Sequence, residues 1–315
     1  MNKLETSVGP LRLSNPVMPA SGCFGPELGT LIDLNRLGAL VTKTVFARPR
    51  SGNPAHRLHE TEAGMLNSVG IPSRGLEFFI TETLPEYRRF APPTIVSIGG
   101  LSVADFWDIA ERLRNIPGIA ALEVNISCPN LEAGGLEIGG NPKTVEAVIR
   151  GVVDRSNVPT IAKLTPNVTS IAEIARAAEA GGAAALSAIN TLVGLAVDLS
   201  RSCLSLGSGV GGLSGPAIKP IALRMVWEVC NAVDLPVIAV GGIASAADAL
   251  EFLAVGAKAV QVGTATFTRP DAMIRIIDDI ETYLVGHGNG SIQEFIGSVR
   301  TDPRSVASDV VGVGG

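Results

Sequence analysis

The segment TIAKLTPNVTSIAEIARAAEAGGAAALSAINT (160–191) shows the unit from which this chain is built. Two short apolar runs, TIAKLTP (160–166) and ALSAINT (185–191), lie at its ends. Apolar runs of this length indicate strands that are buried on both faces, which is typical of parallel sheets. Between them, Ser170 and Glu173 have the spacing of a capping box and two glycines follow, so we expect a helix there. The segment therefore predicts two parallel strands joined by a helix.

Six further apolar runs of the same kind occur along the chain. They are VMPASG (17–22), LGALVTKT (37–44), TIVSIGG (94–100), LEVNISCP (122–129), VIAVGG (237–242) and AVQVGT (259–264). Helical spacing separates most of them, as in 105–116 and 244–257. Eight strand–helix repeats favour closure into a single-domain (β/α)8 TIM barrel, with a doubly wound open sheet as the alternative. We expect the barrel to occupy residues 1–299 and a mobile tail to occupy 300–315.

Length, composition and charge agree with this fold class and exclude others. The chain has 315 residues, of which 46% are hydrophobic and 17% charged, and a barrel needs about 250 residues. The net charge of −5 and the lack of a basic run argue against nucleic acid or an anionic membrane as a partner. The N-terminus resembles no secretion signal, and no run of about 18 apolar residues occurs. We therefore expect a cytoplasmic protein.

The four cysteines are Cys23, Cys128, Cys203 and Cys230, and none forms a C-x-x-C pair. This spacing predicts neither a zinc site nor an iron–sulfur cluster, so we expect no metal site in the chain. Free cysteines are most often buried spacers, and three of the four have no feature that suggests another role.

Cys128 differs from the other cysteines because it lies in NISCPN (125–130), directly after a predicted strand. A thiol at the mouth of a barrel can act as nucleophile, metal ligand or proton acceptor. A Cys–His dyad could form only through His56 or His59, and we expect both of these histidines to be exposed or packed within a loop. The residues alone leave the role of the thiol open.

Polar residues end several of the predicted strands. Lys43 and Lys163 lie in otherwise apolar runs, where a buried lysine is costly unless it pairs with an anion. One such lysine could form a structural ion pair. Two of them, converging with hydroxyls and amides at one barrel mouth, favour an anionic ligand. The neighbouring polar residues are Ser21, Thr44, Asn125, Ser127, Asn190 and Thr191.

Glycines end the last two predicted strands, at Gly241, Gly242 and Gly263. Barrels often bind phosphate through backbone N–H groups of these two loops, although Gly-Gly pairs are also common in tight turns. GSGVGG (207–212) formally matches G-x-G-x-x-G, but no strand precedes it, so we interpret it as a flexible loop. Long stretches such as 45–75, 129–141 and 192–215 also follow predicted strands and are expected to be binding loops.

Eight motifs, taken in order, resemble those of class 1 dihydroorotate dehydrogenases, and the resemblance covers about residues 4–285. The motifs are NPVMPASG (15–22), VTKT (41–44), NSVGI (67–71), NISCPN (125–130), INTL (189–192), GGLSGPAIKPIALRMV (211–226), VGGI (240–243) and VQVGT (260–264). The resemblance implies oxidation of (S)-dihydroorotate to orotate in de novo pyrimidine (UMP) biosynthesis. In this family Cys128 would be the base that removes the carbon-5 proton, while carbon 6 gives hydride to one non-covalent FMN.

The same resemblance implies which residues bind each molecule. The flavin contacts would be Ser21, Lys43, Thr44, Asn125, Lys163, Ile189, Gly215, Gly241, Gly242, Gly263 and Thr264. The substrate contacts would be Lys43, Asn67, Ser68, Val69, Gly70, Ile71, Asn125, Asn190 and Thr191. Ser97 stands where the family has asparagine, so it is not counted as a site residue, and 201–212 also diverges.

The stretch 47–71 resembles the NAD-linked subclass, class 1B. In that subclass a partner subunit carries FAD and a 2Fe–2S cluster, and a catalytic homodimer forms part of a heterotetramer. Alternatives are a fumarate-dependent class 1A homodimer and a related FMN enzyme for another reduced pyrimidine. A flavin-free, phosphate-binding barrel of the aldolase or isomerase type is the alternative from another class, and a catalytically inactive partner subunit is a further one.

Overall fold

The structure is a computed structural model, and it describes residues 3–127, 129–130, 136–288 and 290–299. The predicted catalytic residue Cys128 and the predicted tail 300–315 lie outside these residues. Among the described helices, none has both the length and the hydropathy needed to cross a membrane.

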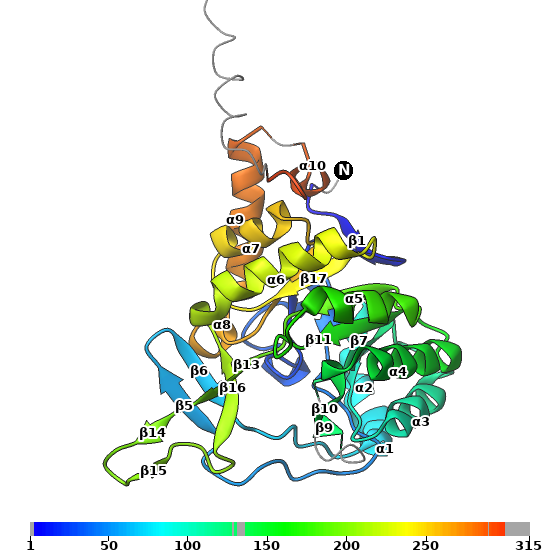
Figure 1. Cartoon of the computed structure of the whole chain (residues 1–315). Helices are drawn as coiled ribbons and strands as arrows, with labels where there is room; N and C mark the ends of the chain where they lie inside the picture. Colours follow the sequence, from blue (N-terminus) through cyan, green and yellow to red (C-terminus); the bar gives the residue numbers. More distant parts are fainter. Residues whose placement is uncertain (1–2, 128, 131–135, 289, 300–315) are drawn as a thin grey trace, which may run out of the picture.

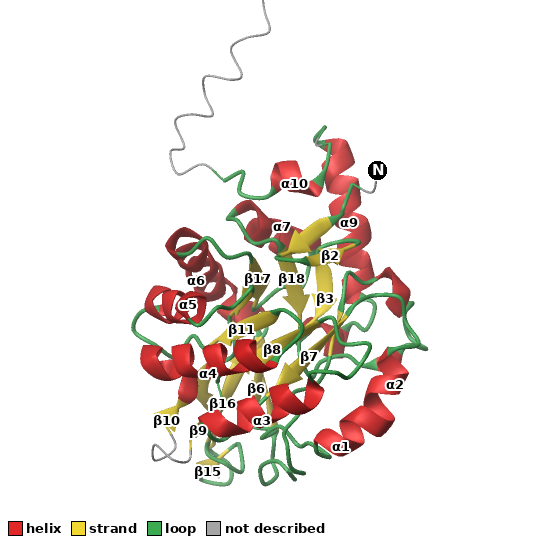
Figure 2. Ribbon diagram, turned by 90° about the vertical axis from the view of Figure 1, so that its right-hand side faces the viewer, coloured by secondary structure: helices red, strands yellow, loops and turns green. Residues whose placement is uncertain are grey.

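Eight parallel strands form the central sheet (Figure 2). They are β3 (Val17–Pro19), β4 (Leu40–Val41), β7 (Thr94–Ile98), β8 (Ala121–Asn125), β11 (Thr160–Leu164), β12 (Ala185–Ala188), β17 (Val237–Val240) and β18 (Ala259–Val262). Their order in space is β3-β18-β17-β12-β11-β8-β7-β4, so the first strand of the barrel pairs with the last. The Gly38 N–H donates to the Val17 carbonyl at 2.8 Å and joins the two ends of the sheet. The predicted TIM barrel is therefore confirmed.

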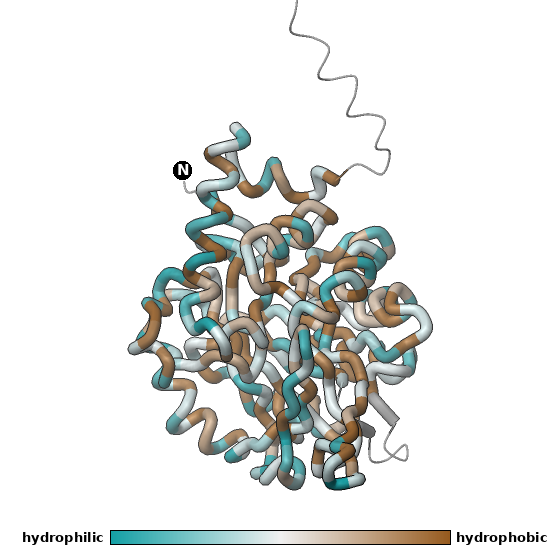
Figure 3. The backbone as a smooth tube through the Cα atoms, turned by 90° about the vertical axis from the view of Figure 1, so that its left-hand side faces the viewer, coloured by the Kyte–Doolittle hydropathy of each residue, from teal (hydrophilic) through white to brown (hydrophobic). Residues whose placement is uncertain are grey.

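Helices surround the barrel (Figure 1). They are α1 (Leu76–Phe78), α2 (Leu84–Tyr87), α3 (Val103–Leu113), α4 (Pro142–Arg155), α5 (Ile171–Ala180), α6 (Lys219–Ala232), α7 (Ala246–Ala254), α8 (Ala265–Thr268), α9 (Ala272–Gly286) and α10 (Ile292–Phe295), and a π-helix, Phe79–Thr83, links α1 to α2. Figure 3 shows hydrophilic and hydrophobic segments alternating along them, as expected of helices that bury one side.

The helix predicted at 105–116 is α3. It begins earlier than predicted, at Val103, because Ser102 is its N-cap and forms a capping box with Asp105, and it ends at Leu113. In α5 the Ser170 hydroxyl accepts from the Glu173 N–H, which is the serine half of the predicted box.

Two of the long stretches fold together as a second, antiparallel sheet beside the barrel (Figure 1). Its strands are β5 (Leu58–Thr61), β6 (Gly64–Asn67), β13 (Leu192–Leu195) and β16 (Val210–Ser214), and β14 (Val197–Asp198) pairs with β15 (Cys203–Leu204) next to it. The prediction of a flexible loop at 207–212 is therefore wrong for β16. A Cβ on Gly212 would lie 2.0 Å from Thr191 Oγ1, so this glycine permits close packing. The stretch 129–141 contains β9 (Pro129–Asn130), β10 (Leu136–Glu137) and a 3₁₀ turn, Ile138–Gly140; other 3₁₀ turns are Pro26–Leu28, Leu34–Arg36 and Pro216–Ile218.

The amino end of the barrel is closed by a hairpin that the sequence did not indicate. Its strands are β1 (Thr6–Val8) and β2 (Leu11–Leu13). The side chains of Val8, Leu11 and Leu13 join a buried cluster with inward residues of the barrel strands. The cluster is completed by Met18, Ala39, Val41, Ile95, Ala121, Ile161, Ala185, Ile238 and Ala259. This end of the barrel is therefore a packed apolar core, and the carboxyl end, called the mouth below, is the one that can carry chemistry.

Candidate active site

Hydroxyl groups from three neighbouring strand ends meet at the mouth. The Ser21 hydroxyl donates to the Thr42 carbonyl at 2.8 Å and lies 3.2 Å from Thr44 Oγ1. Thr44 Oγ1 is also 2.9 Å from the buried Ser97 hydroxyl. Ser97, which was not counted as a site residue from the sequence, is thus part of the same contact.

Two asparagines continue this chain of contacts around the mouth. Asn125 Nδ2 donates to Thr44 Oγ1 at 3.5 Å, and Asn125 Oδ1 accepts from Asn190 Nδ2 at 3.1 Å. Asn190 Oδ1 in turn accepts from the Thr191 N–H at 2.8 Å. We call this set the mouth network. It contains Ser21, Thr44, Ser97, Asn125, Asn190 and Thr191, and all but Ser97 were predicted from the sequence.

Lys163 lies directly beside the mouth network, because it pairs in register with Asn125 on β8. The lysine is only 6% exposed, and its Nζ donates to Gln261 Oε1 at 2.8 Å. It forms no salt bridge with any described residue. Among the described residues, Lys163 therefore forms no structural ion pair, and its ammonium charge remains available to a ligand.

Lys43 follows β4 at the mouth and is exposed. Partial burial of its ammonium lowers the pKa of Lys43, the positive charge of Arg57 lowers it further, and Glu27 opposes both effects. An anion placed here would relieve the repulsion between the two cations. With Lys163, this gives the mouth two positive charges that have no carboxylate partner among the described side chains.

Glycines occupy the other side of the mouth. Gly215, Gly241 and Gly242 all have positive φ, at 92°, 128° and 76°. A Cβ on Gly241 would lie 3.5 Å from Ile189 Cγ1, and a Cβ on Gly215 would lie 3.6 Å from Thr264 Cγ2. The predicted residues of this side therefore lie together.

The glycine side also offers free hydrogen-bond donors. Within the described part of the chain, no protein acceptor receives the backbone N–H groups of Gly242, Gly263 and Thr264. A Cβ on Gly242 would lie 2.8 Å from the backbone nitrogen of Lys219, so only glycine fits there. Unpaired N–H groups at the ends of the last two strands suit a phosphate. The residues present thus fit a ligand that has both a phosphate and an anionic or hydrogen-bonding ring.

The predicted substrate loop, Asn67–Ile71, is anchored by the antiparallel sheet. Asn67 Nδ2 donates to the Gly212 carbonyl at 3.2 Å, and Gly212 packs against Thr191. The Ser68 hydroxyl accepts from Asn53 Nδ2 at 2.8 Å and contacts Ser208. Gly212 of β16 therefore connects the loop to Thr191 of the mouth network. Among the described residues, the loop forms no direct hydrogen bond with Asn125 or Lys43.

Cys128, the predicted base, lies outside the described residues. Its neighbour Ser127 has a buried hydroxyl without a hydrogen-bond partner in the described part of the chain. Burial raises the pKa of the Cys23 thiol to about 11 even though the charge of Lys163 opposes the shift, and burial also raises that of Cys230 to about 11. Neither is a useful base near neutral pH. The expectation that Cys203 is a buried spacer is wrong, because it is exposed on the β14–β15 hairpin.

His56 is exposed and His59 is half-buried in β5, as expected for residues without a catalytic role. The described residues contain no group of three His, Cys, Asp or Glu side chains that could hold a metal ion.

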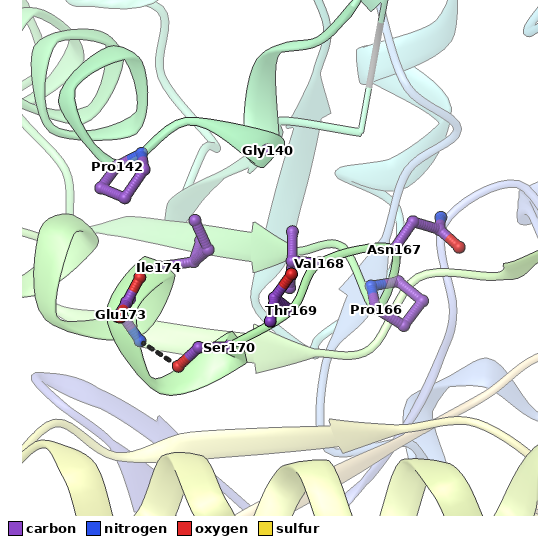
Figure 4. Close-up of a pocket in the computed structure, with 9 residues that line it drawn as sticks. All are labelled: Gly140, Pro142, Pro166, Asn167, Val168, Thr169, Ser170, Glu173 and Ile174. Carbon is purple, nitrogen blue, oxygen red and sulfur yellow. Dashed lines mark hydrogen bonds between the residues drawn. The ribbon is translucent and has the colours of Figure 1, made fainter.

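A cavity of about 590 Å³ lies next to the mouth, between the loops that follow β8 and β11 (Figure 4). Gly140 and Pro142 line one side of it and Pro166–Ser170 the other, and none of its lining residues was predicted as a site residue. Asn167 links this cavity to the site, since its Nδ2 donates to the Thr191 carbonyl at 3.3 Å.

Four polar residues of the barrel interior were missed from the sequence: Ser97, Glu123, Ser187 and Gln261. Each is a polar residue in a mainly apolar strand, and the two lysines were noticed in the sequence for the same reason.

The fold and the site define a TIM-barrel protein whose polar side chains and unpaired glycine N–H groups gather at the carboxyl end of its strands. The family model described as dihydroorotate dehydrogenase matches residues 3–284, and the chain belongs to this family. It is 49% identical over 298 residues to a protein of Desulforudis audaxviator (strain MP104C), covering 94% of this chain and 97% of that one. It is 48% identical over 297 residues to a protein of Desulforamulus reducens (strain ATCC BAA-1160 / DSM 100696 / MI-1), covering 94% and 98%. Both relatives are named dihydroorotate dehydrogenase B (NAD(+)), catalytic subunit.

Proposed function

We propose that this chain is the catalytic subunit of an NAD-linked dihydroorotate dehydrogenase and oxidises dihydroorotate to orotate in pyrimidine biosynthesis. The observation that carries the proposal is the mouth network with Lys163 beside it, built on a barrel that belongs to this family. Relatives named as catalytic subunits support a separate electron-transfer subunit as partner. We infer that this partner carries FAD and a 2Fe–2S cluster, and that the catalytic chain is a homodimer in a heterotetramer.

The residues of the mouth fit one FMN per chain. The glycine side would hold the phosphate through backbone N–H groups, and Ser21, Thr44, Asn125 and Lys163 would hold the ring. When bound, FMN supplies the two-electron acceptor that no protein side chain provides. Positive charge from Lys163 beside the ring stabilises the negative charge of the reduced form.

The substrate is recognised by amides and by Lys43. Asn67, Asn125 and Asn190 each offer a donor pair and an acceptor, which matches the alternating groups of a pyrimidine imide. The Lys43 ammonium would bind the carboxylate, and that contact is strengthened by the partial burial of the lysine.

Cys128 would act as the base that removes the proton from carbon 5. A thiol with an ordinary pKa near about 8.5 is a competent base at mildly alkaline pH, or near neutrality when its pKa is lowered by a neighbouring positive charge. Cys128 is three residues after Asn125 of the mouth network in the sequence. Desolvation raises the pKa of the half-buried Cys23 and Cys230 thiols to about 11, so both are protonated near neutral pH.

The experiment that tests the proposal is anaerobic reduction of the FMN-reconstituted chain. Dihydroorotate should bleach the flavin absorbance, and the chain alone should reduce artificial acceptors but not NAD. Addition of the electron-transfer subunit should confer NAD reduction. Rapid turnover of fumarate by the chain alone would instead assign it to the class 1A homodimers. Failure to take up FMN would favour the flavin-free barrel, and bound flavin that dihydroorotate cannot bleach would indicate an inactive subunit.

A further inference from the structure

A carboxylate is buried in the barrel interior directly below the mouth. Glu123 is on β8, two residues before Asn125, and its side chain is 0% exposed. Its Oε2 accepts from the Ser187 hydroxyl at 3.0 Å and from Gln261 Nε2 at 2.6 Å. Its Oε1 has no hydrogen-bond partner among the described residues. A buried carboxylate with one unpaired oxygen is costly, so its presence at this position calls for a role.

Glu123 and Lys163 are joined through Gln261. Gln261 is also 0% exposed, and while its Nε2 donates to Glu123, its Oε1 accepts from Lys163 Nζ at 2.8 Å. A carboxylate can only accept hydrogen bonds and an ammonium can only donate them. Because one end of the amide faces each of these groups, its orientation is fixed by their chemistry.

The two charges therefore have opposite sign and are separated by a single oriented amide. Glu123 supplies a negative charge near the buried ammonium through the oriented amide of Gln261 rather than by direct contact. The other N–H donors of the Lys163 ammonium have no acceptor among the described residues, so they can bind a ligand at the mouth network.

We propose that Glu123 is a positioning residue that, through Gln261, holds the Lys163 ammonium in place beside the cofactor. The inference rests on the proposed FMN site and adds to it a residue that does not contact the cofactor. Glu123, Lys163, Ser187 and Gln261 form a polar layer in the barrel interior below the mouth. The proposal also accounts for this layer, because packing alone would favour apolar side chains there.

The test is the affinity of the apo-protein for FMN, measured by quenching of flavin fluorescence without substrate. In Glu123→Gln, the new amide can donate as well as accept, so Gln261 can turn its Nε2 towards Lys163. The lysine then loses its acceptor, and FMN should bind about 10- to 100-fold more weakly, as expected for a lost hydrogen bond to a charged group. The midpoint potential of the bound flavin should also fall, because the ammonium is no longer held in place.

Ser187→Ala provides the matched control. It removes the other hydrogen bond to the same Glu123 oxygen without altering the contact between Gln261 and Lys163. It should lower the melting temperature and leave the FMN affinity unchanged. If both variants weakened FMN binding equally, Glu123 would be only a structural residue and the proposal would be overturned.

The double variant Glu123→Gln/Gln261→Glu tests the direction of the contacts. It places an acceptor-only carboxylate against Lys163 and an amide behind it, so FMN affinity should recover towards that of the unmodified chain. If Glu123→Gln does not fold, Gln261→Met can be used instead. It removes the amide between Glu123 and Lys163, and with it the acceptor of Lys163, so it should weaken FMN binding to the same extent.

FMN affinity that is unchanged in Glu123→Gln, or in Gln261→Met, would overturn the inference. If the unmodified chain does not bind FMN, both the proposed function and this inference are overturned. If the unmodified chain binds FMN and the variants bind it equally well, only this inference is overturned.

Discussion

The two ends of the barrel interior are built from the same strands and yet differ in every property that matters for function. On β11, Ile161 belongs to the apolar cluster at the amino end, and Lys163 lies in the polar layer below the mouth. The same change occurs on β18, between Ala259 and Gln261. Two residues of strand rise only about 6.6 Å. On one strand, therefore, a residue that stabilises the barrel and a residue of the candidate site can be only two positions apart.

The separation follows from what covers each end. The β1–β2 hairpin seals the amino end with Val8, Leu11 and Leu13, so any polar group there would be buried without water or ligand. The mouth is covered by loops and by the antiparallel sheet, which can admit a ligand to satisfy polar groups. Changes at the two ends should consequently affect different measurements.

The largest effect is expected from Cys128→Ala, which should remove chemistry at the mouth and leave the amino end intact. Flavin reduction by dihydroorotate should slow by about 10²–10⁴-fold, the usual range for loss of a general base. FMN absorbance and the melting temperature should match those of the unmodified chain. Cys128→Ser should retain more activity than alanine but require higher pH, because a hydroxyl ionises less readily than a thiol. Bleaching of the alanine variant at the normal rate would show that another group is the base.

Ile161→Ala should have the opposite profile. Truncation of this buried side chain leaves a cavity in the apolar cluster and should lower the free energy of unfolding by about 2–5 kcal/mol. Because Ile161 belongs to the apolar cluster of the amino end and to neither the glycine side nor the mouth network, the FMN dissociation constant of the folded fraction should not change. Urea unfolding and flavin titration, carried out on the same preparation, measure both quantities. Weaker FMN binding in this variant would contradict the separation of the two ends.

Lys163→Met, two residues along the same strand, is the partner of that experiment. It nearly keeps the volume of the side chain, but it leaves Gln261 Oε1 and the buried Glu123 carboxylate without the ammonium, so the free energy of unfolding should also fall, by about 3–5 kcal/mol. FMN binding should weaken by about 10- to 100-fold through loss of a charge-assisted contact. The two variants should therefore differ in FMN affinity rather than in stability, and unchanged FMN binding by Lys163→Met would contradict the separation of the two ends.

The smallest effect concerns Lys43 and pH. Its pKa is lowered by partial desolvation and by the charge of Arg57, so its ammonium loses its proton at a lower pH than an ordinary lysine would. The protonated form exists below this pKa and binds the substrate carboxylate, so orotate affinity should decrease as pH rises through it. Lys43→Arg keeps its charge over the whole range and should bind orotate with little dependence on pH in this interval. Perturbation of the flavin spectrum by orotate measures both curves, and parallel curves would exclude Lys43 as the carboxylate ligand.

The fold could be predicted from the sequence because buried parallel strands leave continuous apolar runs, and each of the eight runs overlaps a barrel strand. The antiparallel sheet could not, because β16 is rich in glycine and is defined by its pairing with β6, about 145 residues away. The three-residue strands β1 and β2 are too short to show a period.

The mouth network was also predictable in large part, since Ser21, Thr44, Asn125 and Asn190 follow strand ends that meet in any closed barrel. Glu123 and Gln261 were missed for a physical reason. Each was a lone polar residue until the fold brought together strands 138 residues apart, and only then does their hydrogen bond show why they are polar.

The pairing of β3 with β18 has a consequence for the synthesis of the chain. The seam of the barrel joins Val17 to Val260, so the first strand to leave the ribosome has its partner among the last. At ordinary translation rates, roughly 10–50 s separate the appearance of the two. Throughout that interval the edge of β3 that pairs with β18 has no partner, and the cluster beneath the hairpin lacks Ala259. The nascent chain therefore resembles an open sheet, and its protection from aggregation during translation depends on chaperones or on rapid release rather than on its own core.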